Sequence, residues 1–337
     1  MRIALDVMGG DHGPSPNVAG AILAVQAIPD IAIVLVGDKP QIESLLSADG
    51  SPSSDRLEII HAPQAVDMKE KPAEALRRKP DASIFQCWQL LAEGKVDGLV
   101  SAGNTGAVVA GGLRTRKFLK AVHRPGIATV MPTARGRCVI VDVGANVFPK
   151  PRHLLEYGVM GSVFAQRILG IERPTIGLMN VGEEEGKGHD LVQKTYDLFR
   201  ASPLKERFVG NIEGRDIHRG AVDVVVTDGF TGNVVLKLSE GVFEFVMSMV
   251  QREIIGALSV EKDKATTALK ELLGKYHYSA FGGAPLLGIA GVCIICHGSS
   301  KERAIANAIG VAAQGVRMRV NDAIVAELET LPCSDAE

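Results

Sequence analysis

Short apolar runs alternate with amphipathic stretches along most of the chain. The apolar runs are rich in Val and Ile and hold few polar positions, which is typical of strands buried on both faces of a parallel sheet. They predict strands at residues 2–6, 31–37, 57–60, 97–101, 139–142, 175–181, 207–209, 223–227 and 292–297. Strands that alternate with helices in this way predict an α/β fold, a mainly parallel sheet wrapped by helices.

The amphipathic stretches predict the helices of this fold. Ser15 and Pro16 provide an N-cap followed by proline at the first helical position of the first helix. Helices are expected at residues 16–28, 41–47, 83–93, 105–117, 152–169, 189–200 and 300–329, with a surface loop at 48–55. No internal repeat or linker divides the sequence, so we expect a single domain over residues 1–337.

A helical excursion is predicted between Gly241 and Tyr278, outside the alternation of strands and helices. Its first part carries apolar residues at helical spacing, namely Val242, Phe245, Val246, Met249, Val250 and Ile254. A second, lysine-rich helix is expected from Glu261 to Lys275. Two interpretations stay open. The pair packs in the core or against a second subunit, or its surplus of apolar residues contacts a membrane or a partner.

Composition and charge exclude several classes of protein. The formal net charge of −2 provides no global field that would attract nucleic acid. No stretch of about 18 uncharged apolar residues occurs, so no spanning helix is expected. The first residues, Met1 to Asp6, enter a strand directly and lack the features of a signal peptide. We therefore expect a cytoplasmic protein.

The five cysteines are scattered, as in proteins of a reducing compartment. Residues 293–297, Cys-Ile-Ile-Cys-His, match the spacing of a c-type haem attachment site. However, the predicted strand places residues three apart on opposite faces of the sheet. A zinc site would need a second pair of ligands. Cys293 and Cys296 are therefore expected in the core, with neither cofactor nor metal.

Candidate chemistry lies in the loops that follow six of the predicted strands. Each loop is a short run of Gly, Asn, Asp, Ser or Thr, at residues 6–14, 101–106, 142–146, 180–188, 228–233 and 297–300. Parallel sheets bind ligands at the carboxyl ends of their strands. Glycines there let backbone N–H groups approach an anion, and helix N-termini add partial positive charge. We expect the six loops to share one edge of the sheet and to hold an anionic substrate.

None of these loops matches a nucleotide or hydrolase motif. Residues 182–188 are one residue short of a P-loop and lack its Ser/Thr, no G-x-G-x-x-G opens the first helix, and no G-x-S-x-G occurs. The run Glu183–Glu185 is more typical of a solvated loop than of a metal site. Lys187 can reach a phosphate as a mobile charge or be a surface lysine. His12 can act as an acid–base group or a donor, or only cap the first turn.

Several of these segments, in the same order along the chain, carry a family resemblance. They are residues 6–14, 101–107, 124–126, 141–146, 210–216, 223–237, 282–284 and 297–300. Through them the sequence resembles the bacterial phosphate acyltransferases, which convert acyl-[acyl carrier protein] and inorganic phosphate to acyl phosphate. The run Val224–Val234 is the most specific part. The resemblance implies a Rossmann-like fold related to phosphate acetyltransferases and isocitrate-dehydrogenase-type enzymes.

The resemblance further implies a homodimer that associates peripherally with the membrane. Its product would feed a membrane glycerol-3-phosphate acyltransferase in phospholipid synthesis. Lys187 and Asn233 match positions expected to contact the reacting groups, although the loop around Lys187 varies in the family. We add His12 to these catalytic candidates. The predicted substrate- and phosphate-binding residues are Asp6, Gly9, Gly10, Asp11, Gly103, Asn104, Thr105, Gly106, Asn146, Asp228, Thr231 and His297.

The implied reaction needs little acid–base catalysis. Phosphate is substantially dianionic near neutral pH, and a thiolate with a pKa of about 8.5 leaves readily, so direct attack on the thioester is expected. The enzyme would supply alignment and donors to the developing oxyanion. A CoA-dependent phosphate acetyltransferase is the first rival. A lipid- or acyl-binding module is disfavoured by six polar loops, and a decarboxylating dehydrogenase by the lack of a carboxylate cluster.

Overall fold

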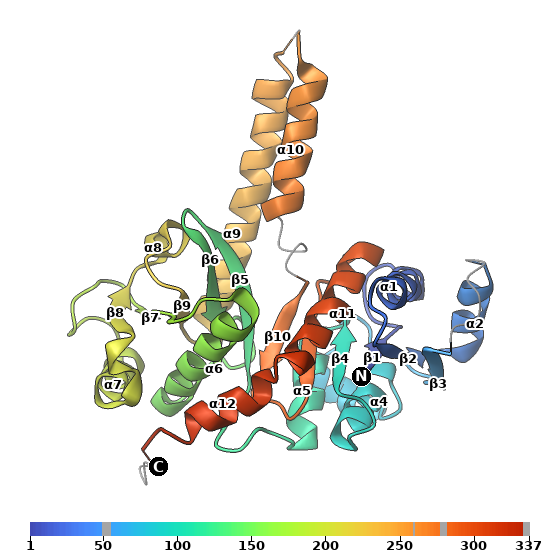
Figure 1. Ribbon diagram of the computed structural model, residues 1–337, viewed down its shortest axis with the longest axis horizontal. Coiled ribbons are helices and arrows are strands. Elements are labelled where there is room, and N and C mark those ends of the chain that lie inside the picture. The colour runs from blue at the N-terminus through green and yellow to red at the C-terminus, as the bar shows by residue number, and fades with distance from the viewer. Residues whose placement is uncertain (49–54, 259, 277–281, 333–337) are drawn as a thin grey trace.

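The computed structural model describes residues 1–48, 55–258, 260–276 and 282–332. The predicted loop at 48–55 lies largely outside this part. Within it, eleven strands form one sheet in the order β3-β2-β1-β4-β11-β10-β5-β6-β9-β7-β8. Helices cover both faces of this sheet (Figure 1). The predicted class, an α/β fold with a mainly parallel sheet, is confirmed.

All nine predicted strands are present, in two parallel sets. The first set contains β1 (Arg2–Asp6), β2 (Ala32–Gly37), β3 (Leu57–His61), β4 (Gly98–Ser101) and β11 (Val292–Ile295). The second set contains β6 (Gly136–Val141), β7 (Ile176–Met179), β8 (Phe208–Ile212) and β9 (Val224–Val226). Apart from the edge strand β3, most residues of these strands are buried, as their apolar runs predict.

Two further strands, β5 (Gly126–Thr133) and β10 (Ala284–Leu287), join the two sets. β10 pairs antiparallel with β11 and with β5, and β5 pairs antiparallel with β6. Neither strand was predicted from the sequence. They contain Pro132 and Pro285, and proline within an apolar run argues against a central strand.

These three antiparallel pairings change where the strand-end loops lie. Each pairing reverses the strand direction, so the two parallel sets run in opposite directions. The expectation that all six loops share one edge of the sheet is therefore wrong. Three loops follow strands of the first set and three follow strands of the second. The two groups converge on β5 and β10, where Ile295 pairs with Ala284 and Val141 pairs with Ala128.

The helices bury the sheet through three clusters of apolar side chains. One cluster packs α1 and α11 on the first parallel set, and a second packs α6, α7 and α12 on the other set. The third runs under both sets, with α4 and α5 at one end and α8 at the other. The bounds are α1 Pro14–Ala27, α2 Lys39–Ala48, α3 Pro72–Arg78, α4 Ser83–Ala92, α5 Thr105–Thr115, α6 Pro151–Leu169, α7 Asp190–Ala201, a 3₁₀ turn Pro203–Glu206, α8 Gly214–Arg219, α11 Glu302–Arg317 and α12 Val320–Leu328.

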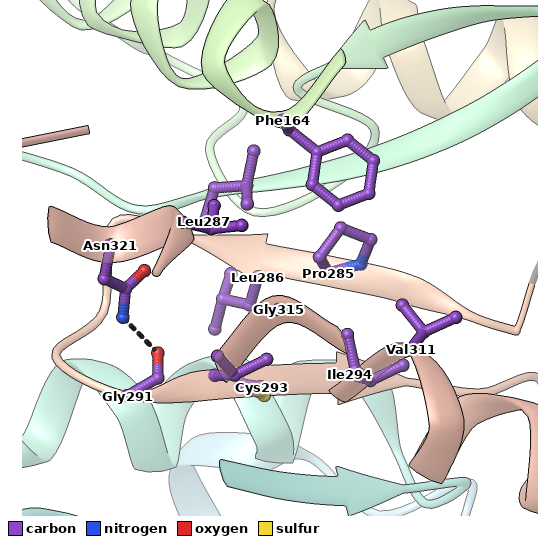
Figure 2. Close-up of a pocket in the computed structure, with 12 residues that line it drawn as sticks. Phe164, Pro285, Leu286, Leu287, Gly291, Cys293, Ile294, Val311, Gly315 and Asn321 are labelled. Carbon is purple, nitrogen blue, oxygen red and sulfur yellow. Dashed lines mark hydrogen bonds between the residues drawn. The ribbon is translucent and has the colours of Figure 1, made fainter. Parts of the chain in front are cut away.

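The single helix predicted over residues 300–329 is wrong, because the chain turns between α11 and α12. Arg319 adopts the left-handed conformation, with φ of 50°, and redirects the backbone. Asn321 then donates to the carbonyl oxygens of Ile289 and Gly291, which ties α12 to the β10–β11 connection. Figure 2 shows the Asn321–Gly291 bond beside a small, mostly apolar cavity. At about 20 Å³ this cavity holds no more than about one water and is too small for a substrate.

The helical excursion is a hairpin that projects from the body of the molecule (Figure 1). It is formed by α9 (Gly229–Met249), a π-helical turn (Val250–Ile255) and α10 (Lys262–Tyr276). The helix expected from Gly241 thus begins twelve residues earlier. Within α9 only Gly229 and Gly232 are buried, whereas large side chains such as Leu238 and Phe245 are 65% and 64% exposed. The part of α9 beyond Gly241 therefore does not lie in the core of the subunit, whereas Val235 and Leu236 near its start pack against a core cluster.

The predicted orientation of the paired cysteines is confirmed. Cys293 belongs to the cluster beneath α4 and α5, whereas Cys296 belongs to the cluster beneath α1 and α11, on the other face of the sheet. Both thiols are buried. Burial raises the pKa of the Cys296 thiol to about 12, and that of Cys138 also to about 12.

We predict that the four buried thiols of the native protein do not react with a soluble disulfide reagent. They are Cys87, Cys138, Cys293 and Cys296. Thiolate is the reactive form, and at pH 8 almost none is present when the pKa is about 12. The test uses a Cys333→Ser variant, which removes the fifth thiol. No release within minutes is expected before denaturant is added, and four equivalents afterwards. A fast-reacting thiol in the native variant would contradict the prediction.

Candidate active site

The loop after β1 is organised around the buried carboxylate of Asp6. This carboxylate accepts hydrogen bonds from Ser83 Oγ at 2.5 Å and Ser101 Oγ at 2.7 Å. Burial raises its pKa, and these hydroxyls, with the backbone amides of Met8 and Gly9, oppose the rise. All of these partners lie within the chain, so the Asp6 carboxylate holds the loop after β1 in its conformation.

The loops after β1, β4 and β11 touch one another at their backbones. A Cβ at Gly9 would lie 2.6 Å from the backbone nitrogen of Gly103, so only glycine permits this approach. The Asp11 amide donates to the Gly298 carbonyl at 2.8 Å. The sequence analysis missed Asn17, whose buried amide donates to the carbonyls of Val7 and Gly9, 2.8 Å each. Such a side chain shows no sequence signal, because it lies inside a helix.

In the loop after β4, the side chain of Asn104 is used within the protein. Its Oδ1 accepts from the Ala107 amide at 3.0 Å and caps α5, while its Nδ2 donates to the Met68 and Glu70 carbonyls at 3.0 Å each. Gly106 lies against Pro72, where a Cβ would approach within 2.4 Å. Asn104 therefore joins the segment that precedes α3 to this loop.

The loop after β6 closes on the carboxylate of Asp142. This buried group accepts from the backbone amides of Ile127, Gly144, Ala145 and Asn146 at 2.7–3.1 Å. Burial raises its pKa, and these four amides oppose the rise. The Asn146 side chain donates to the Pro125 carbonyl at 2.7 Å and lies 2.8 Å from the Tyr157 hydroxyl. Asn146 thus fixes the loop to the start of β5 and to α6.

The loop after β9 starts α9 directly against the loop after β6. Asp228 caps the helix by accepting from the amides of Phe230 and Thr231 at 2.9 Å, and from Thr231 Oγ1 at 2.7 Å. The Gly229 amide donates to the Asn146 carbonyl at 2.8 Å. These contacts place the first turns of α9, and with them Asn233, beside the junction of the two strand sets.

A cavity of about 140 Å³ lies where the strand ends of the two sets meet. The first set and its loops supply Thr105, Ile295, Cys296 and His297 to its lining. β5 supplies Ile127 and Thr129, and the start of β10 with the residue before it supplies Gly283 and Ala284. Val143 and the first turns of α9 complete it with Asn233, Leu236, Lys237 and Glu240. This junction cavity therefore brings together three predicted site residues, Thr105, Asn233 and His297.

The other two predicted catalytic residues do not line the junction cavity. His12 is exposed in the loop after β1. Lys187 lies in the loop after β7, with a side chain 55% exposed and its Nζ 3.9 Å from Glu184. Neighbouring glutamates of that loop have protein partners as well, since Glu185 accepts from the Tyr196 hydroxyl at 2.7 Å.

Lys237 and Glu240, which were not among the predicted site residues, are the Lys and Glu side chains of the junction cavity. Lys237 Nζ lies 2.9 Å from Glu240 Oε2. Both follow Asn233 along one face of α9, four and seven residues later. This spacing is visible in the sequence only if the helix begins near residue 229, whereas the apolar pattern predicts a start at residue 241.

The junction cavity offers groups that suit an anion and a carbonyl oxygen. The Asn233 amide can donate through Nδ2, Lys237 brings a positive charge, and Thr105 and Thr129 bring hydroxyls. Apolar side chains such as Ile127 and Leu236 line the rest, which strengthens electrostatic interactions at the polar groups. Such a site can align an anionic nucleophile with a carbonyl and stabilise the charge that develops on the oxygen.

The fold is similar to that of solved phosphotransacetylase structures. The structure of the EutD phosphotransacetylase from Staphylococcus aureus superposes with a TM-score of 0.60, at 18% identity, over 94% of each chain. A phosphotransacetylase from Streptococcus pyogenes gives a TM-score of 0.59, also at 18% identity, over 98% of this chain and 94% of that one. At this identity the likeness concerns the fold.

Sequence comparison identifies the family. The family model described as "Fatty acid synthesis protein" matches residues 1–323. The phosphate acyltransferase of Heliobacterium modesticaldum is 46% identical over 331 residues, 96% of each chain. That of Desulfitobacterium hafniense strain DSM 10664 / DCB-2 is 45% identical over 336 residues, 97% of this chain and 98% of the relative. The chain belongs to the phosphate acyltransferase family, as its motifs predict.

Proposed function

We propose that this protein transfers a long-chain fatty acyl group from acyl-[acyl carrier protein] to inorganic phosphate. A phosphate oxygen attacks the thioester carbonyl carbon, a C–O bond forms and the C–S bond breaks. The thiol of the carrier protein leaves with the sulfur electron pair and the proton of hydrogen phosphate, and acyl phosphate is the other product. Membership of the phosphate acyltransferase family supports this reaction. The observation that carries the proposal is the junction cavity, where an amide and an ammonium group lie on one helix face.

In this proposal Asn233 donates to the thioester oxygen as it becomes negative, and His297 and Thr105 contact phosphate from the opposite strand set. The part of the site that holds phosphate is formed by glycine-rich backbone, at Gly9, Gly10, Gly103 and Gly106, together with Asp11. Lys187 contacts a reacting group, as the family resemblance suggests. His12 does the same, as its place in the loop after β1 suggests. From the loop after β7, Lys187 would have to extend toward the substrate, since its side chain is mostly in solvent.

Acyl phosphate would pass to a membrane glycerol-3-phosphate acyltransferase for phospholipid synthesis. A homodimer in peripheral contact with the membrane fits this role, and the projecting hairpin supports it with exposed Phe245, Met249 and Ile254. Such a contact would be at the surface. Among the described residues, no helix is both long and apolar enough to cross a membrane.

We predict that release of free carrier protein from acyl-[acyl carrier protein] depends on phosphate. Because phosphate is the nucleophile, omitting it should abolish release and the formation of acyl phosphate. Free carrier thiol is followed by a chromogenic reagent, and acyl phosphate is trapped by hydroxylamine. Release at the same rate without phosphate would indicate a thioesterase and contradict the proposal. Acyl-CoA as the donor provides the other arm, and faster turnover with acyl-CoA would favour a CoA-dependent phosphotransacylase.

A further inference from the structure

The roles of Asn233, His297 and Thr105 leave one ion pair of the junction cavity without a specific part in the reaction. It joins Lys237 and Glu240, both on α9, with Nζ and Oε2 2.9 Å apart. The Glu240 side chain is 17% exposed, whereas that of Lys237 is 53% exposed. A carboxylate withdrawn from water needs a partner. Lys237 supplies this partner and is thereby held at the wall of the cavity.

The ion pair leaves donor capacity on the lysine. An ammonium group has three N–H donors, and the bond to Glu240 is the one hydrogen bond found for Lys237 Nζ among the described residues. Lys237 is also the one lysine or arginine among the residues that line the cavity. An anion that enters can therefore replace water on the remaining donors without breaking the ion pair.

The position of Lys237 relative to Asn233 fits two reacting groups. Residues four apart on a helix lie one above the other, with Cβ atoms about 5–6 Å apart. An amide that donates to the thioester oxygen and an ammonium that holds the attacking phosphate would then lie side by side on α9. His297, contributed by the other strand set, closes the opposite wall of the cavity.

We infer that Lys237 binds the phosphate nucleophile in the junction cavity and that Glu240 positions the lysine for this task. The inference rests on the proposed function, because it assigns the substrate phosphate to a particular side chain. It is distinct from the role of Lys187, which lies in another loop and outside the cavity lining. A phosphate held here would face the carbonyl carbon from the side of α9.

The test compares variants under saturating acyl-[acyl carrier protein] while phosphate is varied. Lys237→Met alone would leave Glu240 without its partner, so the main variant is K237M/E240Q, which removes both charges and keeps both shapes. Its KM for phosphate is expected to rise about ten- to a hundredfold, the loss typical of a charge-assisted hydrogen bond, with KM for the acyl donor nearly unchanged. E240Q alone keeps the lysine charge and an acceptor, so its KM for phosphate should stay near the wild-type value.

Lys194→Met is the matched control, because Lys194 also pairs with a carboxylate on its own helix, Asp190, at 2.8 Å, but on α7 in solvent. Binding of inorganic phosphate alone, followed by ³¹P line broadening, separates binding from turnover. An unchanged KM for phosphate and unchanged line broadening in K237M/E240Q would overturn the role of Lys237. Wild-type release that needs no phosphate would instead overturn the proposed function itself.

Discussion

Replacing Asn233 by alanine is expected to lower kcat/KM about 100-fold, the loss typical of a deleted oxyanion donor. The exposed Asn233 side chain lines the junction cavity, and we find no hydrogen bond to it among the described residues. Its amide is thus available to a substrate. Alanine is the best helix former, so the start of α9 should persist. The measurement is the initial rate of phosphate-dependent release of carrier protein.

Asn233→Asp is the informative companion variant. It keeps the size of the side chain and replaces the NH₂ donor by an acceptor, so the loss should be at least as large as in N233A. Equal thermal unfolding temperatures would show that both variants are folded. If N233A keeps kcat/KM within about threefold of wild type, Asn233 does not stabilise the oxyanion.

Lys187→Ala is also expected to lower kcat/KM about 100-fold, and retained activity in that folded variant would remove Lys187 from the site.

The strands and helices that could be predicted from the sequence are those with a clear local pattern. Runs such as 31–37 and 223–227 are continuous and β-branched, and the strand is decided within the run itself. β5 and β10 differ, because each is completed by pairing with strands far away in the sequence. Each of these two strands contains a proline, which argues against a strand when only the local pattern is considered. Without these two strands, the opposed direction of the two strand sets could not be foreseen.

In the candidate site too, only features with a local pattern in the sequence could be predicted. Glycine and asparagine in the strand-end loops predict where a ligand would bind, and Asn233 and His297 both line the junction cavity. The loop sequences do not show which polar groups would bind a ligand and which form hydrogen bonds within the protein. Asp6, Asn104 and Asn146 turn out to hydrogen-bond within the protein. Buried hydrogen bonds of this kind depend on tertiary contacts, and the same residue types serve both purposes.

Replacing Gly232 by alanine should damage activity and stability together, because α9 lies so close to the loop after β6. A Cβ at position 232 would be 1.9 Å from the backbone carbonyl oxygen of Asp142. Four backbone amides donate to the Asp142 carboxylate, so this residue is not free to move away. The helix must then move by more than about 1 Å, and a misplacement of that size can cost about 100-fold in rate. Overpacking of this kind typically costs about 1–3 kcal/mol of stability.

Gly241→Ala is the matched control for Gly232→Ala, since it makes the same change in the same helix with no atom within 4 Å of the new Cβ. That variant should keep its activity and gain about 0.5–1 kcal/mol in stability, as alanine replaces glycine inside a helix. Rates and thermal unfolding of both variants check the pair. Full activity in folded G232A would mean that α9 tolerates displacement. Asn233 would then not need the close contact between α9 and Asp142 to act, and the oxyanion role argued for it would lose its geometric basis.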